Sequence, residues 1–255
     1  MNIRAPESSG FLRPIWKRAF GSPWVLSLVA LALLATVRYL AVFGPPTVRI
    51  LFPLHCLVMW ALPFIFLTVQ GRRQIGLRRP VRIISSFVLS AIVGAVSGLA
   101  IYFIGSALFG NSPDNWCVSI GEAFQLKQLL GLMPRAAVFA VIALPAMILT
   151  PIGEEILFRG LIQQAFTFRW SERVAIVVNG LAFGLIHLHV HGLWRDPSGL
   201  HLRLVSGGMM ILLLAFASAV FTICRLRTGS LFAAMVAHAF CNLAMISAVF
   251  FHYIG

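Results

Sequence analysis

The chain has 255 residues, of which 60% are hydrophobic and 11% are charged, and its mean hydropathy is +0.93. Because soluble domains carry roughly 25% charged residues, this composition excludes an ordinary soluble domain and indicates a membrane protein. The formal net charge of +13 is a balance that also occurs in nucleic-acid-binding proteins. The basic residues lie in short gaps between apolar runs, however, so we expect a lipid bilayer and no nucleic acid as the partner.

Apolar runs of about 20 residues, the length that a helix needs to cross the hydrocarbon core, predict seven membrane spans. In chain order these are Trp24–Phe43, Ile50–Val69, Ile83–Phe109, Ala136–Phe166, Val174–His189, Leu204–Ile223 and Ser230–Phe251. The fourth run is long and contains Pro145 and Pro151, so it could hold an eighth span. The sequence predicts an all-α, polytopic membrane helix bundle. Residues 1–23 are expected to form a cytoplasmic N-terminal segment and residues 24–255 a single transmembrane domain.

The link between the third and fourth spans ends in a mixed stretch, Ile120–Met133, which fits either an interfacial helix or an ordered loop. The four cysteines show no paired spacing and are interpreted as small packing residues, with no redox or zinc signal. They are Cys56, Cys117, Cys224 and Cys241.

The distribution of Lys and Arg predicts the orientation, because their excess in short loops stays in the cytoplasm. With the N-terminus inside, fourteen lie on the cytoplasmic side and five on the other. The fourteen are Arg4, Arg13, Lys17, Arg18, Arg72, Arg73, Arg78, Arg79, Arg82, Arg159, Arg169, Arg173, Arg225 and Arg227, and the five are Arg49, Lys127, Arg135, Arg195 and Arg203. Arg38 is expected near the outer end of the first span, with its side chain extended toward the headgroups. Separately, the short length of the chain, its short loops and the lack of an organelle-retention tail favour a prokaryotic plasma (inner) membrane.

Two of the seven acidic residues, Glu154 and Glu155, are adjacent within the fourth span. An ionisable residue inside a span indicates function, because its charge is costly there unless it is paired or hydrated. Glu155 and Arg159 are four residues apart and share a helix face, so we expect them to form an ion pair. Glu154 is less well placed for Arg159 and is the candidate general base. Both carboxylates could instead be structural.

Three further polar residues lie in later spans. His187 ends the run Phe183-Gly-Leu-Ile-His187, and with His189 and His191 it could also belong to an interfacial or metal-binding cluster. His238 and Asn242 are one turn apart, about 6 Å along the helix axis, so both could donate to one substrate oxygen as an oxyanion hole. They could also merely join two helices. At 1.5 Å per residue, Glu154, His187 and His238 lie roughly 18, 20 and 12 Å from the cytoplasmic ends of their spans, so a shared pocket is expected.

These residues resemble the three ordered motifs of the CPBP (CAAX protease and bacteriocin-processing, or Abi) intramembrane proteases, which include the type II CAAX prenyl endopeptidases. The motifs are Glu154-Glu155-x-x-x-Arg159, Phe183-x-x-x-His187 and His238-x-x-x-Asn242, and the resemblance covers about residues 150–245. It implies a membrane endopeptidase that acts on a peptide or a membrane protein, lipidated substrates included.

The resemblance also implies the catalytic roles. Glu154 would activate a water that His187 helps to hold, and His238 and Asn242 would stabilise the oxyanion. Glu155 and Arg159 would support the helix and its electrostatics. No metal or other cofactor is implied by this mechanism.

Three alternatives stay open. Zinc could bind His187, His238 and a carboxylate, although the sequence lacks the H-E-x-x-H pattern that places two ligands on one helix. The buried ionisable residues could instead line an ion or proton pathway in a transporter. A non-catalytic membrane scaffold of the same fold is the third alternative.

Overall fold

The computed structural model describes residues 9–48 and 50–254. In chain order its elements are α1 (Pro14–Phe20), α2 (Pro23–Phe43), η1 (Pro46–Val48), α3 (Leu51–Phe66), α4 (Val69–Gln74), α5 (Ile83–Phe109), α6 (Trp116–Ala123), α7 (Leu126–Leu132), α8 (Arg135–Glu155), η2 (Ile156–Ile162), α9 (Gln163–Thr167), α10 (Glu172–Ile186), η3 (His187–His189), β1 (Leu193–Asp196), β2 (Gly199–Leu202), α11 (Leu204–Thr228) and α12 (Leu231–Ile254). Arg4, Arg49 and the first eight residues of the expected N-terminal segment lie outside the described residues.

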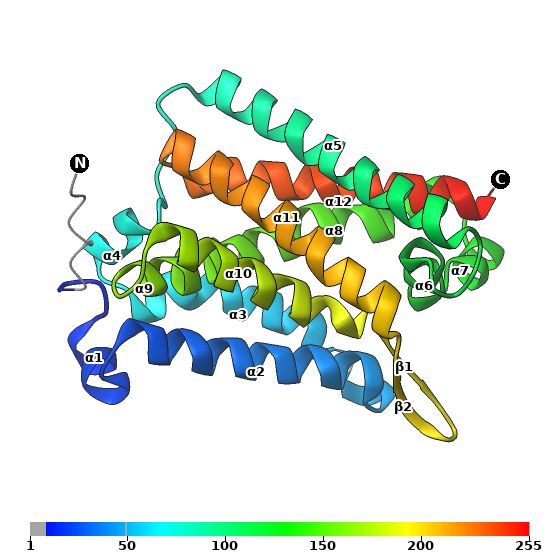
Figure 1. The fold of residues 1–255 in the computed structure, drawn as a ribbon, viewed down its shortest axis with the longest axis horizontal. Coiled ribbons are helices and arrows are strands. Elements are labelled where there is room, and N and C mark those ends of the chain that lie inside the picture. The colour runs from blue at the N-terminus through cyan, green and yellow to red at the C-terminus, as the bar shows by residue number, and fades with distance from the viewer. Residues whose placement is uncertain (1–8, 49, 255) are drawn as a thin grey trace.

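The long helices run side by side along the molecule, and the short elements gather at its two ends (Figure 1). One end holds α1, α4, α9, the beginning of α5 and the end of α11. The other end holds α6, α7, the C-terminus and the β1–β2 hairpin. This arrangement is that of a helix bundle whose loops alternate between two opposite faces.

Five helical stretches are long and apolar enough to cross a membrane: α2, α5, the continuous stretch Arg135–Thr167, α11 and α12. Helix α3 is apolar but has 16 residues, and α10 has 15. The all-α polytopic bundle is therefore confirmed, whereas the number of seven spans stays a prediction. Because Arg135–Thr167 is one uninterrupted helix, the fourth run contains no additional span.

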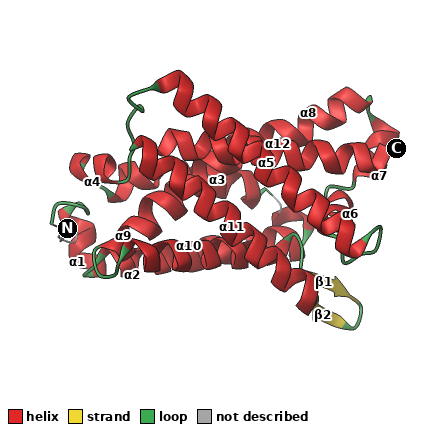
Figure 2. Ribbon diagram, turned by 45° about the horizontal axis from the view of Figure 1, so that its top comes forward, coloured by secondary structure: helices red, strands yellow, loops and turns green. Residues whose placement is uncertain are grey.

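The segments between the long helices are also ordered. The stretch Ile120–Met133, for which a helix and a loop were both open, contains the end of α6 and all of α7. Strands β1 and β2 pair antiparallel, with Leu193 opposite Leu202, and form the small hairpin at the edge of the otherwise helical molecule (Figure 2). All four cysteines are unpaired, and three of them are buried, which agrees with a packing role.

Small residues let the helices approach closely. A side-chain carbon at Gly94 of α5 would lie 1.9 Å from the backbone oxygen of Ala237 in α12. The same construction at Gly184 of α10 gives 2.5 Å to the backbone oxygen of Ile211 in α11. Such contacts through glycine are a general way to pack membrane helices, and here they hold α12 beneath α5 and α10 against α11.

Two arginines that the orientation count placed in cytoplasmic segments lie inside the bundle. Arg159 is fully buried in η2, and Arg225 is buried near the end of α11. The Arg225 guanidinium donates to the backbone oxygens of Ile75 and Gln74 and to the Gln164 side chain. Among the residues that the structure describes, the other arginines of that set lie in or beside α1, α4, the beginning of α5, the α9–α10 link and the end of α11, at one end of the bundle. The predicted orientation itself stays a prediction.

Candidate active site

Four helical segments bring their buried polar residues to one place. Glu154 and Glu155 end α8, Arg159 lies in η2, His187 follows α10 and His238 lies in α12. Glu154 Oε2 lies 3.7 Å from His187 Nε2 and 3.8 Å from His238 Nε2. The residues that the sequence predicted at similar depths thus meet around the Glu154 carboxylate.

The backbone around the two glutamates departs from a regular α-helix. Pro151 has no N–H to donate to the preceding turn, and directly after Glu155 the chain forms the π-helical segment η2. π-helical turns are rare and often occur at functional sites. Gly153, beside Glu154, allows the helix to approach α3, since a Cβ there would lie 2.9 Å from Met59 Cβ.

Glu155 is held in a fully buried ion pair. Its Oε1 lies 2.9 Å from Arg159 NH1 and accepts a 2.8 Å hydrogen bond from His238 Nδ1. The Arg159 guanidinium lies over two aromatic rings, 4.4 Å from the centroid of Phe183 and 5.1 Å from that of Phe221. A weakly hydrated guanidinium gains energy from such faces when no water is near. Glu155 and Arg159 therefore neutralise one another while Glu155 orients His238.

Two aromatic residues complete this cluster. The ring of Phe221 stacks on His238 at 4.8 Å with an interplanar angle of 15°, and the ring of Phe183 meets His238 edge-on at 5.5 Å. Phe183 belongs to one of the sequence motifs, but Phe221 lies in an apolar stretch of α11 that carries no comparable signal. Its place in the site becomes visible only in the packing of α11 against α12.

Glu154 has a partner that the sequence did not reveal. Arg38 of α2 donates from NH2 to Glu154 Oε1, and its Nε donates 3.1 Å to His55 Nε2 from α3. Arg38 is 2% exposed, so the expectation that it extends to the headgroups is wrong. Glu154, which the spacing made a poor partner for Arg159, is thus paired with a cation that α2 supplies. An arginine inside a span was the available signal, but the sequence cannot show which helix it faces.

The hydrogen bonds of the two active-site histidines assign their ring protons. His187 Nδ1 lies 2.7 Å from the Phe183 backbone oxygen, and His238 Nδ1 lies 2.8 Å from Glu155 Oε1. Because both partners only accept, each Nδ1 carries a proton, and each Nε2 of a neutral ring presents a lone pair. Both lone pairs face Glu154 Oε2.

Oε2 of Glu154 has an unused acceptor position. Among the residues that the structure describes, none donates a hydrogen bond to this buried oxygen. A water molecule placed between Oε2 and the two imidazoles could donate to the carboxylate and to one ring, since the separations of 3.7 and 3.8 Å are too long for direct hydrogen bonds. The side chain of His187 is 17% exposed, against 3% for Glu154, so His187 is the more accessible of the two.

Asn242 lies one turn beyond His238 but points elsewhere. Its Nδ2 donates 2.8 Å to the backbone oxygen of Ala146 in α8. The structure therefore places Asn242 on the α8–α12 contact rather than in a hydrogen bond with Glu154 or His238.

The other histidines of the His187, His189, His191 run have hydrogen-bond partners outside the Glu154 cluster. His189 Nδ1 lies 2.5 Å from the Ile186 backbone oxygen, and His191 lies between Ser119 and Ser206 at 2.6 and 3.2 Å. Burial, together with the nearby Arg203, lowers the pKa of His191 to about 4, so that ring is neutral at pH 7. In the described part of the chain, no three His, Cys, Asp or Glu side chains are spaced to hold a metal ion.

Comparison with known families agrees with the resemblance seen in the motifs. Residues 136–244 match the family model described as "Type II CAAX prenyl endopeptidase Rce1-like". The matched region contains every site residue named from the sequence, but neither Arg38 nor His55. No curated protein and no solved structure matches the chain. The match covers less than half of the chain, and over this region the chain is similar to that family.

Proposed function

We propose that this chain is an intramembrane endopeptidase that hydrolyses a peptide bond with a water activated by Glu154. One observation carries the proposal: the unpaired Oε2 of Glu154 and the Nε2 atoms of His187 and His238 converge, 3.7 and 3.8 Å apart, on a position that suits one water. General bases must lie within hydrogen-bond reach of the proton that they remove. The CAAX-type family match supports the same chemistry.

In the proposed reaction, the water oxygen attacks the carbonyl carbon as Glu154 Oε2 takes its proton. The carbonyl π electrons move to the oxygen and form a tetrahedral oxyanion. When this intermediate collapses, the C–N bond breaks and the glutamic acid returns the proton to the leaving amine. Arg38, bonded to the other oxygen of the same carboxylate, keeps Oε2 directed toward the water.

His238 and Asn242 are the proposed oxyanion donors. Because His238 Nδ1 already donates to Glu155, its Nε2 can donate to the oxyanion only when the ring is protonated. Asn242 must exchange its bond to the Ala146 oxygen for the substrate oxyanion. Donors aimed at such an oxygen typically contribute about 10²–10³ in rate.

The substrate is proposed to be a peptide or membrane protein, lipidated ones included, that reaches the buried site within the bilayer. We place the enzyme in a prokaryotic plasma (inner) membrane with its N-terminus in the cytoplasm. The excess of Lys and Arg in the loops at one end of the bundle supports this orientation.

The decisive experiment compares peptide termini of membrane and secreted proteins from cells that carry the wild type or Glu154→Gln. Glutamine keeps the size of the side chain but cannot take the proton, so termini produced by the enzyme should disappear. Glu122→Gln is the matched control, because Glu122 is an exposed carboxylate of α6. If both variants are present at wild-type levels and no terminus differs between them, the peptidase proposal is wrong.

The remaining alternatives make distinct predictions. Zinc chemistry would require that a strong chelator abolishes cleavage and that zinc restores it, whereas we expect full activity with chelator. A transporter would move ions in proteoliposomes without peptide cleavage. A non-catalytic scaffold would keep its cellular phenotype in Glu154→Gln.

A further inference from the structure

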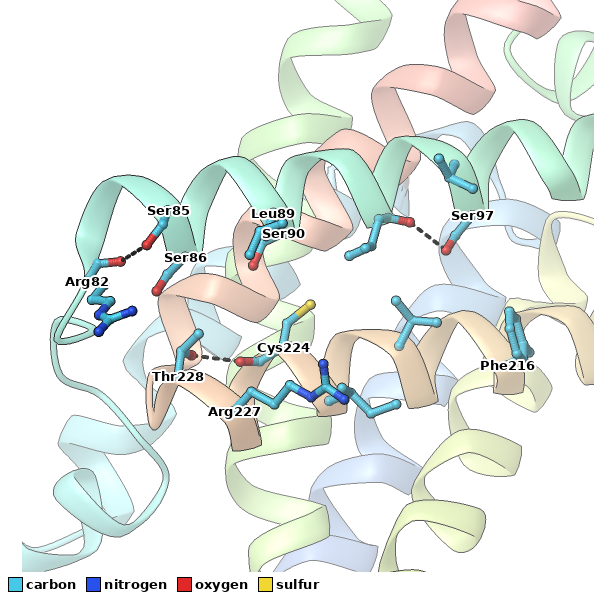
Figure 3. A pocket seen from close by; sticks show the side chains of 14 residues that line it. Arg82, Ser85, Ser86, Leu89, Ser90, Ser97, Phe216, Cys224, Arg227 and Thr228 are labelled. Atoms are coloured by element: carbon cyan, nitrogen blue, oxygen red, sulfur yellow. Dashed lines mark hydrogen bonds between the residues drawn. The ribbon is translucent and has the colours of Figure 1, made fainter.

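A groove of about 690 Å³ lies between α5 and α11, apart from the catalytic cluster (Figure 3). None of its lining residues is one of the proposed catalytic groups. Its walls come from two helices that run side by side, so it follows the long axis of the bundle. The lining residues are Arg82, Ser85, Ser86, Leu89, Ser90, Val93, Val96, Ser97, Phe216, Val220, Ile223, Cys224, Arg227 and Thr228.

The polar groups of the groove are concentrated toward one end. Figure 3 shows Arg82, Ser85 and Ser86 where α5 begins, with Thr228 across from them near the end of α11. The Arg227 side chain extends from the same end of α11 along the groove, below Cys224. From Leu89 onward the α5 wall is mainly apolar, and Phe216 and Val220 face it from α11. One end of the groove, here called its mouth, therefore carries the two arginines and several hydroxyl groups, and the rest of the groove, its body, is mainly apolar.

The two arginines at the mouth are available for a ligand. Both are exposed, and no carboxylate within the described ranges forms an ion pair with either of them. Two cations close to an apolar slot attract an anionic group that is attached to a hydrocarbon chain. A soluble anion would leave the slot empty, and a neutral hydrocarbon would leave the two charges unused.

The dimensions fit one leaflet of a bilayer. From Arg82 to Ser97 the α5 wall spans 15 residues, about 22 Å of helix at 1.5 Å per residue. Half of the hydrocarbon core measures about 15 Å, which leaves a few ångströms for the headgroup region. The mouth lies at the arginine-rich end of the bundle, and anionic lipids are enriched on the cytoplasmic leaflet, where such arginines are expected.

We propose that the α5–α11 groove binds one anionic phospholipid, with its phosphate between Arg82 and Arg227 and an acyl chain along Leu89, Val93 and Phe216. The site does not depend on the proposed peptidase reaction. The lipid would fill the space between α5 and α11 and hold these two helices together at the membrane surface.

The test uses the full-length protein in neutral detergent, titrated with phosphatidylglycerol or phosphatidylcholine and observed by native mass spectrometry. We expect a single retained phosphatidylglycerol and weaker binding of phosphatidylcholine. The double variant Arg82→Gln with Arg227→Gln should lower the affinity for phosphatidylglycerol about 30-fold, since two favourable charge contacts are lost. Arg18→Gln with Arg173→Gln removes the same charge from exposed positions outside the groove and should change little.

A second pair of variants tests the apolar body. Val220→Trp fills the groove and should abolish the retention of phosphatidylglycerol. Val177→Trp places the same side chain on an exposed face of α10, where Val177 is 58% exposed, and should leave the retention unchanged. If the Arg82/Arg227 and Arg18/Arg173 double variants lost the same affinity for phosphatidylglycerol, the effect would come from general surface charge and the proposed site would be wrong. Loss in Val220→Trp with equal binding of both lipids would overturn headgroup recognition. Displacement of phosphatidylglycerol by an uncharged farnesylated peptide would assign the groove to a substrate chain and would also overturn the proposal.

Discussion

At the scale of single residues, the environment of Glu154 is the main addition that the structure makes to the motifs. The spacing of Glu155 and Arg159 predicted an ion pair, and the structure contains it at 2.9 Å, because residues four apart on a helix must face the same way. Local spacing cannot predict contacts between distant spans. Arg38 of α2, which also bonds His55 of α3, reaches Glu154 from more than 90 residues away in the chain, and no periodicity in the sequence predicts that contact.

Arg38→Leu is predicted to destabilise the protein by about 3–5 kcal/mol, because it leaves the buried Glu154 carboxylate without its cation. The double variant Arg38→Leu with Glu154→Gln removes both charges and should be markedly more stable than the sum of the two single changes implies. The free energy of unfolding in mixed detergent micelles measures this coupling. Additive effects would show that the two side chains do not interact.

Asn242→Leu separates the proposed oxyanion role from the observed helix contact. The loss of the bond to the Ala146 oxygen should cost about 1 kcal/mol of stability, whereas the loss of an oxyanion donor should lower kcat about 10²–10³-fold. Cleavage of a peptide identified from the termini comparison gives kcat and KM separately. A variant with unchanged kcat would restrict Asn242 to packing α12 against α8.

At the scale of helices, the site depends on close backbone contacts. Ala237, whose oxygen lies against Gly94, immediately precedes His238 in α12. The approach of α5 therefore fixes the height at which His238 meets Glu155. The positions of the helices followed from apolar run lengths, but the π-helical segment η2 did not, since no residue pattern distinguishes it from an α-helix. The two prolines of α8 only indicated that this helix is irregular.

Gly94→Val is predicted to reduce both stability and cleavage. Its Cβ would lie 1.9 Å from a backbone oxygen, so α5 and α12 must separate, and overpacking of this kind costs about 1–3 kcal/mol or more. Gly208→Ala is the control, because among the described residues no heavy atom lies within 4 Å of its added carbon. The melting temperature and the cleavage rate should both fall in Gly94→Val and stay at wild-type values in Gly208→Ala.

At the scale of the whole molecule, composition and run lengths predicted the helical bundle because bilayers permit few other folds: every backbone group in the hydrocarbon must be bonded internally. The β1–β2 hairpin was not predicted from the sequence, because its strands, Leu193–Asp196 and Gly199–Leu202, are too short to show a clear alternation of apolar and polar residues. The count of basic residues was also imperfect. It treated Arg159 and Arg225 as loop residues, although both are buried inside the bundle. Arg159 forms an ion pair with Glu155, and Arg225 donates a hydrogen bond to the backbone oxygen of Ile75.

The predicted orientation is tested with cysteines introduced at the two ends of the bundle. Val81, 97% exposed beside the beginning of α5, and Ser198, in the turn of the β1–β2 hairpin, lie at opposite ends (Figure 1). In a chain with the partly exposed Cys224 replaced by Ala, an impermeant maleimide added to spheroplasts should label Ser198→Cys directly and Val81→Cys only after the membrane is opened. The reverse pattern would put the arginine-rich end outside. The proposed lipid site would then face the leaflet that is poorer in anionic lipids, so the orientation and the lipid specificity can be checked against each other.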